Sequence, residues 1–115
     1  MGKQISRICT DPLIEYGAEA LESIREKKAS FALDQVTLDI IISTGIVSNM
    51  MSTVDSYYYN STLAHCVYYG STVTEHGHHH LHGEVVSLGV LCLLEFEKDD
   101  SEVERIMEFN SSIGL

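Results

Sequence analysis

The segment Val85–Leu94 is apolar on nearly every side, and it constrains the fold more than any other part of the chain. A helix without a polar face has to be covered by other elements, as at the centre of a helical bundle. The chain has 115 residues, which is enough for one modest hydrophobic core. We therefore expect a single all-α domain over residues 1–115, with this segment at the centre of a helical bundle.

The first half of the chain also carries helical signals. Asp11 and Pro12 form a typical start signal, so we expect a helix from about residue 12 to residue 28. The apolar run 31–42 is rich in β-branched residues, which leaves a strand as an alternative, but its length favours a helix. Gly45 and the polar residues near 48–53 predict an irregular passage after it.

The second half is harder to assign until its last third. Residues 55–70 are compatible with strand or helix, and residues 71–81 are typical of a loop. The sequence Ser101-Glu102-Val103-Glu104 resembles a capping box, which predicts a last helix that ends near Gly114. We find no Gly-rich phosphate-binding motif and no alternation of strands and helices.

Charge and hydropathy exclude several classes of partner. Seven basic and seventeen acidic residues give a net charge of −10, which disfavours binding to nucleic acid or to anionic lipid. The apolar stretch Val85–Phe96 is shorter than the roughly 20 residues of a membrane span.

An odd number of widely spaced cysteines is typical of buried, reduced thiols. We expect a cytoplasmic protein that binds neither membrane nor nucleic acid.

Most of the histidines lie close together, between residues 76 and 82, and another precedes them at residue 65. If His65 lies within one helix and His82 at the start of the next, the two imidazoles can converge on one divalent cation. A catalytic zinc site usually has three protein ligands, so a third group is needed. The local candidates for it are His78, His79, His80 and Glu84. The alternative is a hydrated polar loop that binds no metal.

These residues resemble the metal-binding core of the glycerol dehydrogenases, in the iron-containing alcohol dehydrogenase superfamily. The family pattern A-H-A-x-x-x-G matches residues 64–70 except at Cys66, and H-H-x-x-H-G-E-x-V-x-x-G matches residues 78–89. The two histidine ligands of the family have the same spacing as His65 and His82. The resemblance continues more weakly from about Cys9 to the end of the chain.

The resemblance implies a set of roles for these residues. It implies that His65 and His82 bind a divalent metal, zinc in most glycerol dehydrogenases and iron in many relatives. In the family this metal polarises the alcohol while a hydride passes to NAD. His78, His79 and Glu84 would orient ligands or relay protons, or, for the two histidines, serve a structural role. Glu84 would also be a first-turn carboxylate of the following helix. No residue is assigned to catalysis or to cofactor binding.

The family also has parts that this chain does not match. They are a dinucleotide-binding domain and a third metal ligand, an aspartate, which both precede the matching region; Asp11 and Asp34 do not stand in its context. We therefore expect the chain to correspond to the middle of the helical metal-binding domain. On its own it would bind no NAD and would be inactive, and its partners would be the missing dehydrogenase segments or further copies of itself.

Two alternatives remain from the sequence. One is a relative that shares the H-G-E-x-V helix, such as a 3-dehydroquinate synthase or a glycerol-1-phosphate dehydrogenase. Those enzymes act on phosphorylated substrates, whereas this chain has no Lys or Arg between Lys28 and Lys98 to hold a phosphate. The other alternative is a non-catalytic helical remnant that self-associates through exposed apolar surfaces.

Overall fold

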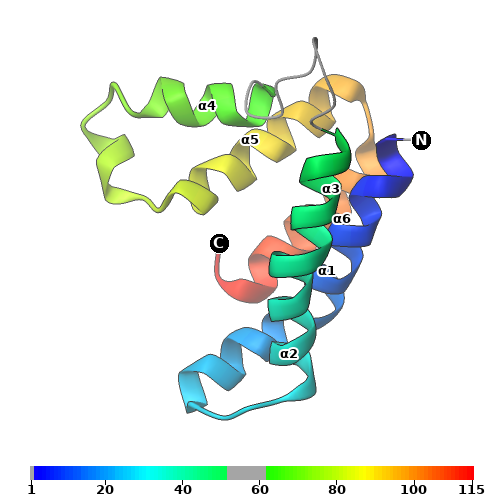
Figure 1. Cartoon of the computed structure of the whole chain (residues 1–115). Coiled ribbons are helices and arrows are strands. Elements are labelled where there is room, and N and C mark those ends of the chain that lie inside the picture. The colour runs from blue at the N-terminus through cyan, green and yellow to red at the C-terminus, as the bar shows by residue number, and fades with distance from the viewer. Residues whose placement is uncertain (1, 52–61) are drawn as a thin grey trace. The chain divides into compact units, whose positions relative to one another are not determined.

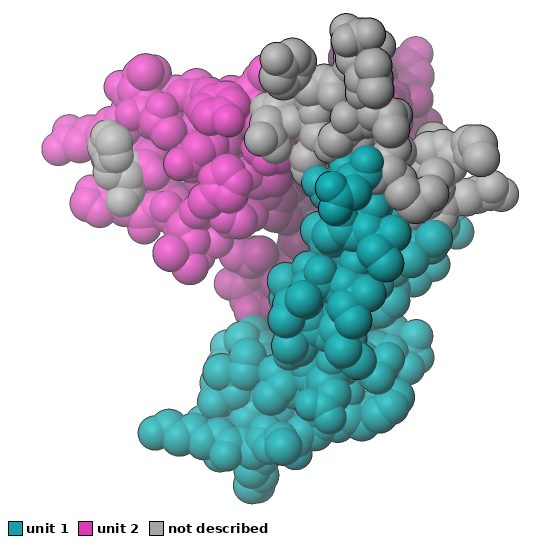
Figure 2. All heavy atoms as spheres, in the orientation of Figure 1, with its two compact units in different colours: residues 1–57 teal, residues 58–115 magenta. Residues whose placement is uncertain are grey.

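A computed structural model describes residues 2–51 and 62–115 of the chain (Figure 1). Every regular element in these two ranges is a helix, which confirms the expected all-α class. The chain divides into two compact units, residues 1–57 and residues 58–115, shown in two colours in Figure 2. The expectation of one domain over residues 1–115 stays a prediction.

The helices of both units follow one another with short connections. The first unit contains α1 (Gly2–Glu26), α2 (Phe31–Leu38), the π-helical turn η1 (Asp39–Ser43) and α3 (Thr44–Met51). The second contains α4 (Leu63–Ser71), the 3₁₀ turn η3 (His76–His79), α5 (His82–Glu97) and α6 (Asp100–Ile113).

Helix α1 is longer than the sequence predicts. It begins at Gly2 and continues through Pro12, so the predicted start at Asp11-Pro12 is wrong. A proline inside a helix removes one backbone hydrogen bond and costs about 3 kcal/mol. Contacts of α1 with α2, η1 and α3 offset that cost. The helix ends at Glu26, two residues before the predicted end, and Lys27 follows in the left-handed conformation (φ 57°).

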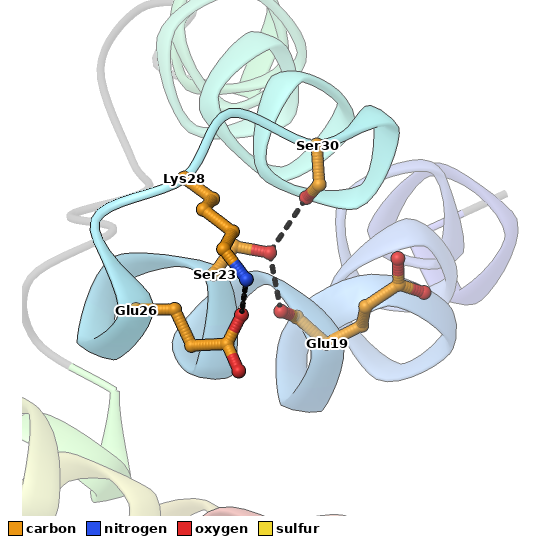
Figure 3. Close-up of polar contacts among 5 residues, drawn as sticks. All are labelled: Glu19, Ser23, Glu26, Lys28 and Ser30. Carbon is orange, nitrogen blue, oxygen red and sulfur yellow. Dashed lines mark hydrogen bonds and ion pairs between the residues drawn. The ribbon is translucent and has the colours of Figure 1, made fainter.

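Two serines join α1 to α2 (Figure 3). The hydroxyl of Ser23 donates to the carbonyl of Glu19 (2.9 Å) and lies 2.7 Å from the hydroxyl of Ser30. Ser30 is the N-cap of α2, and its oxygen accepts the backbone N–H of Leu33 (3.1 Å). Such a cap stabilises a helix by about 1 kcal/mol. A continuous set of hydrogen bonds therefore links the C-terminal part of α1, through Ser23, to the first turn of α2, through Ser30.

The apolar run after residue 30 is helical, as predicted, and the strand alternative is wrong. The predicted irregular passage after Gly45 is also wrong for residues 45–51, because α3 continues through that glycine. The side chain of Asn49 donates to the carbonyl of Gly45 (2.9 Å), so this polar residue is accommodated on the helix itself. Residues 52 and 53 of that prediction lie outside the described residues.

The first unit buries small side chains and exposes large ones. Ala20 and Ala32 are buried, whereas Phe31 is 65% exposed and Ile41 is 67% exposed. The segment Phe31–Asn49 also meets the length and mean hydropathy of a membrane span, at 19 residues and 1.4, with 17% of it buried. Length and hydropathy alone are weak evidence, because helices of soluble proteins meet the same criteria. The segment thus assigns no membrane location.

In the second unit, α4 and α5 lie side by side (Figure 1), and their backbones approach closely at one glycine. A Cβ atom built on Gly89 would lie 2.6 Å from Cα of Ala64 and would also collide with its carbonyl oxygen. Ala64 is itself buried, at 4% exposure. Only a residue without a side chain allows this approach, and the glycine therefore sets the distance between the two helices.

The connection from α4 to α5 is not wholly irregular, since residues 71–81 of the predicted loop contain the turn η3. Gly77 lies against the end of α4, where a Cβ atom would collide with the carbonyl of Ser71. The backbone N–H of Gly77 donates to the carbonyl of Thr74 (3.2 Å). The turn is therefore packed against α4 rather than extended into solvent.

The last helix has the predicted end but a different start. It ends at Ile113, next to Gly114 as the sequence predicts, and Gly114 is in the left-handed conformation (φ 87°). Its N-cap is Asp99, not Ser101, and the carbonyl of Asp99 accepts the backbone N–H groups of Glu102 and Val103. The predicted capping box at Ser101 is wrong. The chain turns immediately after α5, so that only Lys98 and Asp99 lie between α5 and α6.

The cysteines differ from the expectation of buried thiols. Cys9 is partly buried, whereas Cys66 and Cys92 are exposed. Cys66 lies on α4 and Cys92 on α5, the two closely packed helices of the second unit. The structure has all three as free thiols, and the expectation of a reducing environment stays a prediction.

The close approach of α4 and α5 yields a stability prediction. Replacing Gly89 by alanine should lower the free energy of unfolding by about 1–3 kcal/mol, because the new methyl group forces the two backbones apart. Gly70→Ala is the matched control: nothing lies within 4 Å of its Cβ position, so that change should leave stability equal or higher. Urea unfolding followed by circular dichroism measures both, and equal stability of the two variants would contradict the packing.

Candidate metal centre

His65 lies in the first turn of α4, three residues after the N-cap Thr62. Its side chain is partly buried, and its neighbour Ala64 is the residue that packs against Gly89 of α5. The contact that fixes the separation of the helices is therefore adjacent to His65. This histidine stands on the element that is held most closely to α5.

His82 is the first residue of α5, as the sequence predicts, and its side chain is exposed. The rings of His65 and His82 are 5.8 Å apart between centroids and inclined by 44°. The two histidines are seventeen positions apart in the sequence, and the loop with its 3₁₀ turn returns the chain so that they meet. The structure thus brings together the pair that the spacing singled out.

The separation of the rings fits a shared cation. A zinc–nitrogen bond of about 2.0–2.1 Å puts the cation roughly 3.2 Å from the centroid of each imidazole. The centroids of the two rings are 5.8 Å apart, which is less than twice that distance. Neutral imidazole nitrogen is a donor that suits zinc and iron. The donor set is chemically suitable, and one side of it is open to solvent.

Two neighbours of the histidine pair were missed by the sequence reasoning. The hydroxyl of Thr62 lies 3.1 Å from Nδ1 of His65. The ring of Tyr68 meets the ring of His82 edge-on, with centroids 4.2 Å apart. Both residues are three positions from His65, one on each side, and residues at that spacing share a helix face. The three-residue spacing would have predicted both contacts if residues 63–71 had been assigned to a helix.

Glu84 lies in the first turn of α5, as expected, and it interacts with the chain just before that helix. Its Oε2 atom accepts the backbone N–H of Leu81 (3.0 Å) and lies 3.2 Å from Nδ1 of His80. A carboxylate at a helix N-terminus is favoured by the helix dipole and by the unpaired N–H groups there. These contacts stabilise the start of α5 and so the position of His82.

The other candidate ligands do not complete a site in the part of the chain that the structure describes. His79 is exposed at the end of η3, and His80 pairs with Glu84. The backbone of His78 belongs to η3, but its side chain lies outside the described residues. Among the described residues, no group of three His, Cys, Asp or Glu side chains could hold a metal ion. A third ligand therefore stays a prediction.

Known proteins with similar sequences carry the names of dehydrogenases and a reductase. The glycerol dehydrogenase of Thermotoga maritima is 31% identical over 96% of this chain. The glycerol dehydrogenase of Pseudomonas putida is 28% identical over 96% of the chain, and the glycolaldehyde reductase of Halobacterium salinarum is 26% identical over 99%. This chain is a partial homologue of the glycerol dehydrogenases.

The similarity covers a limited part of those relatives. The chain spans 29% of the Thermotoga glycerol dehydrogenase and of the Halobacterium reductase, and 28% of the Pseudomonas enzyme. No family model matches the chain, and no solved structure matches it. The homology to glycerol dehydrogenases thus rests on nearly all of this chain and on less than a third of each relative.

Proposed function

We propose that this chain forms part of a metal-dependent, NAD-linked polyol dehydrogenase of glycerol dehydrogenase type. Its contribution is a pair of histidines, His65 and His82, that bind one divalent cation. The convergence of these two rings, 5.8 Å apart on separate helices, carries the proposal. Similarity to proteins named glycerol dehydrogenase supports the class of reaction.

Zinc is the cation we propose for this site, ahead of iron. Bound there, it would act as a Lewis acid that polarises the oxygen of an alcohol and makes it easier to deprotonate. The residues of the chain hold and orient it: α4 presents His65, and the first turn of α5 presents His82. Tyr68 restricts the ring of His82, and Glu84 anchors the start of its helix.

The cation site is incomplete with two histidines. Catalytic zinc usually has three protein ligands and one open position. The third ligand and the nicotinamide site would come from parts of the enzyme that lie outside the region matched here. We therefore propose that this chain alone binds zinc weakly and oxidises no alcohol. A cytoplasmic location is part of the same proposal.

The substrate class we propose is an unphosphorylated polyol. The relatives reported above are named for glycerol and glycolaldehyde, neither of which carries a phosphate. The stretch between Lys28 and Lys98, which contains both histidines, has no Lys or Arg side chain to hold a phosphate. These two observations favour a glycerol-type enzyme over a 3-dehydroquinate synthase or a glycerol-1-phosphate dehydrogenase.

Zinc titration of the whole chain by calorimetry tests this function. We expect one zinc per chain in the wild type and at least a tenfold loss of affinity in His65→Ala and in His82→Ala, because one imidazole cannot replace two. His79→Ala, which removes an exposed histidine of η3, should bind like the wild type.

Two results would contradict the proposal. The first is zinc binding that is unchanged in both His65→Ala and His82→Ala, since the metal would then be bound elsewhere. The second is activity of the chain alone. Incubation of the purified chain with zinc, NAD and glycerol should give no NADH, and a steady rate of NADH formation would contradict the proposal that the chain alone oxidises no alcohol.

Self-association is a second property that we propose for the chain. Large apolar side chains of α2, η1 and α3 are exposed: Phe31, Leu38, Ile40, Ile41, Ile42 and Ile46. Monomeric soluble proteins rarely expose contiguous apolar surface of this kind. The alternative of a non-catalytic helical remnant rests on the same surface. It differs from the dehydrogenase proposal in predicting no specific zinc binding.

Light scattering coupled to gel filtration tests self-association. We expect a mass of at least two chains, which falls toward one chain in Ile41→Gln because that change places a polar group on the apolar surface. Glu22→Gln, an exposed change on α1, serves as the control and should keep the wild-type mass. A wild-type chain that stays monomeric at about 100 μM, a concentration at which even weak dimers with micromolar dissociation constants form, would contradict the proposal.

A further inference from the structure

The N-cap of α4 has an unusual hydrogen bond. Thr62 occupies the N-cap position with extended backbone angles (φ −70°, ψ 158°), and its side chain makes no cap hydrogen bond to the backbone. Its Oγ1 atom lies instead 3.1 Å from Nδ1 of His65. A threonine at this position usually accepts a backbone N–H of the first turn and stabilises the helix by about 1 kcal/mol. Here the hydroxyl is directed at an imidazole.

This contact decides which nitrogen of His65 can bind a cation. A neutral imidazole carries its proton on one nitrogen and a lone pair on the other. If Nδ1–H donates to the threonine oxygen, the lone pair is on Nε2. If the hydroxyl donates to Nδ1, the proton is on Nε2 and that nitrogen cannot be a ligand. Histidines that bind metals in proteins almost always donate their other N–H to an oxygen acceptor.

We propose that Thr62 is a positioning residue that holds His65 with its proton on Nδ1 and its lone pair on Nε2. This role rests on the proposed function, because the Nε2 lone pair of His65 is the one that would bind the shared cation. Thr62 would set the tautomer of His65 even without bound metal. Thr62 forgoes its usual cap to do so.

The two histidines are thus held by different means. His65 is oriented by a hydrogen bond from its own helix turn, through Thr62. His82 is oriented by an aromatic ring, since Tyr68 meets it edge-on at 4.2 Å. Thr62 and Tyr68 both flank His65 on α4, so a single helix supplies one ligand and the supports of both. The first turns of α4 thereby prepare the pair.

The first experiment needs no metal. Nitrogen-15 NMR of the whole chain distinguishes the two tautomers of His65 at a pH of about 8.5, where imidazole is generally neutral. We expect the proton on Nδ1 in the wild type and in Thr62→Ser, which keeps the hydroxyl. In Thr62→Val, which has the same shape and no hydroxyl, the population should move toward a proton on Nε2. A wild-type protein with the proton on Nε2 would overturn the proposal.

The second experiment measures zinc affinity by calorimetry. Loss of such a supporting hydrogen bond typically costs about 10- to 100-fold in metal affinity, which is our expectation for Thr62→Val. Thr62→Ser should bind within about threefold of the wild type, as the same principle predicts where the acceptor is kept. Thr72→Val is the matched control at the other end of α4, where the hydroxyl donates to the carbonyl of Tyr69 (2.7 Å), and it should leave affinity unchanged.

The outcomes separate this proposal from the one on which it rests. Equal zinc affinity in Thr62→Val and the wild type would overturn the role of Thr62 and leave the histidine pair intact. A wild-type chain that binds no zinc would overturn the proposed function. The NMR measurement of the His65 tautomer would then be the only test of the positioning role of Thr62. Loss of affinity in Thr62→Val with rescue in Thr62→Ser, together with the expected tautomers, supports both.

Discussion

The backbone contact between Gly89 and Ala64 is the constraint on which the second unit depends. It allows α5 to approach α4 closely, and no residue with a side chain fits at position 89 without moving the helices. His65 follows Ala64 directly, and His82 begins the helix that carries Gly89. The distance between the two imidazoles is therefore a consequence of helix packing as well as of the loop between them. A larger separation of the helices would remove the pair.

Small side chains also make up the buried apolar core of the described residues. The buried apolar residues are Ala20, Ala32 and Ala64, while larger side chains remain exposed in both units. Close contact of small residues fixes helix positions but removes little apolar surface from water, and burial of that surface is the main source of stability. Helix geometry is thus well specified by these contacts, whereas the larger apolar side chains named above stay exposed in the described residues.

The sequence predicted the helices best where apolar spacing and end signals agreed. Helix α5 and the end of α6 at Gly114 followed from patterns that act within a few residues. The predicted helix start at Pro12 and the irregular passage after Gly45 were wrong, because contacts with neighbouring helices and a side-chain bond from Asn49 outweighed local propensity. Propensity is a weak prior that packing often overrides.

Within the candidate site, the two histidines were predicted from the sequence, whereas the residues that support them were not. The spacing of His65 and His82 predicted their convergence, because a loop of that length returns the chain to the same end of a helix pair. The support from Thr62 and Tyr68 could not be predicted while the helix over residues 63–71 was unassigned, since the face that a residue shares depends on that assignment. The sequence therefore indicates ligands more readily than the groups that orient them.

X-ray absorption spectroscopy of the zinc-loaded chain shows whether two imidazoles of this chain share one cation. We expect scattering from two imidazole rings, bound through nitrogen at about 2.0–2.1 Å, with oxygen atoms in the remaining positions. A spectrum with no imidazole scattering, or one that is unchanged when His65 and His82 are replaced together, would contradict it.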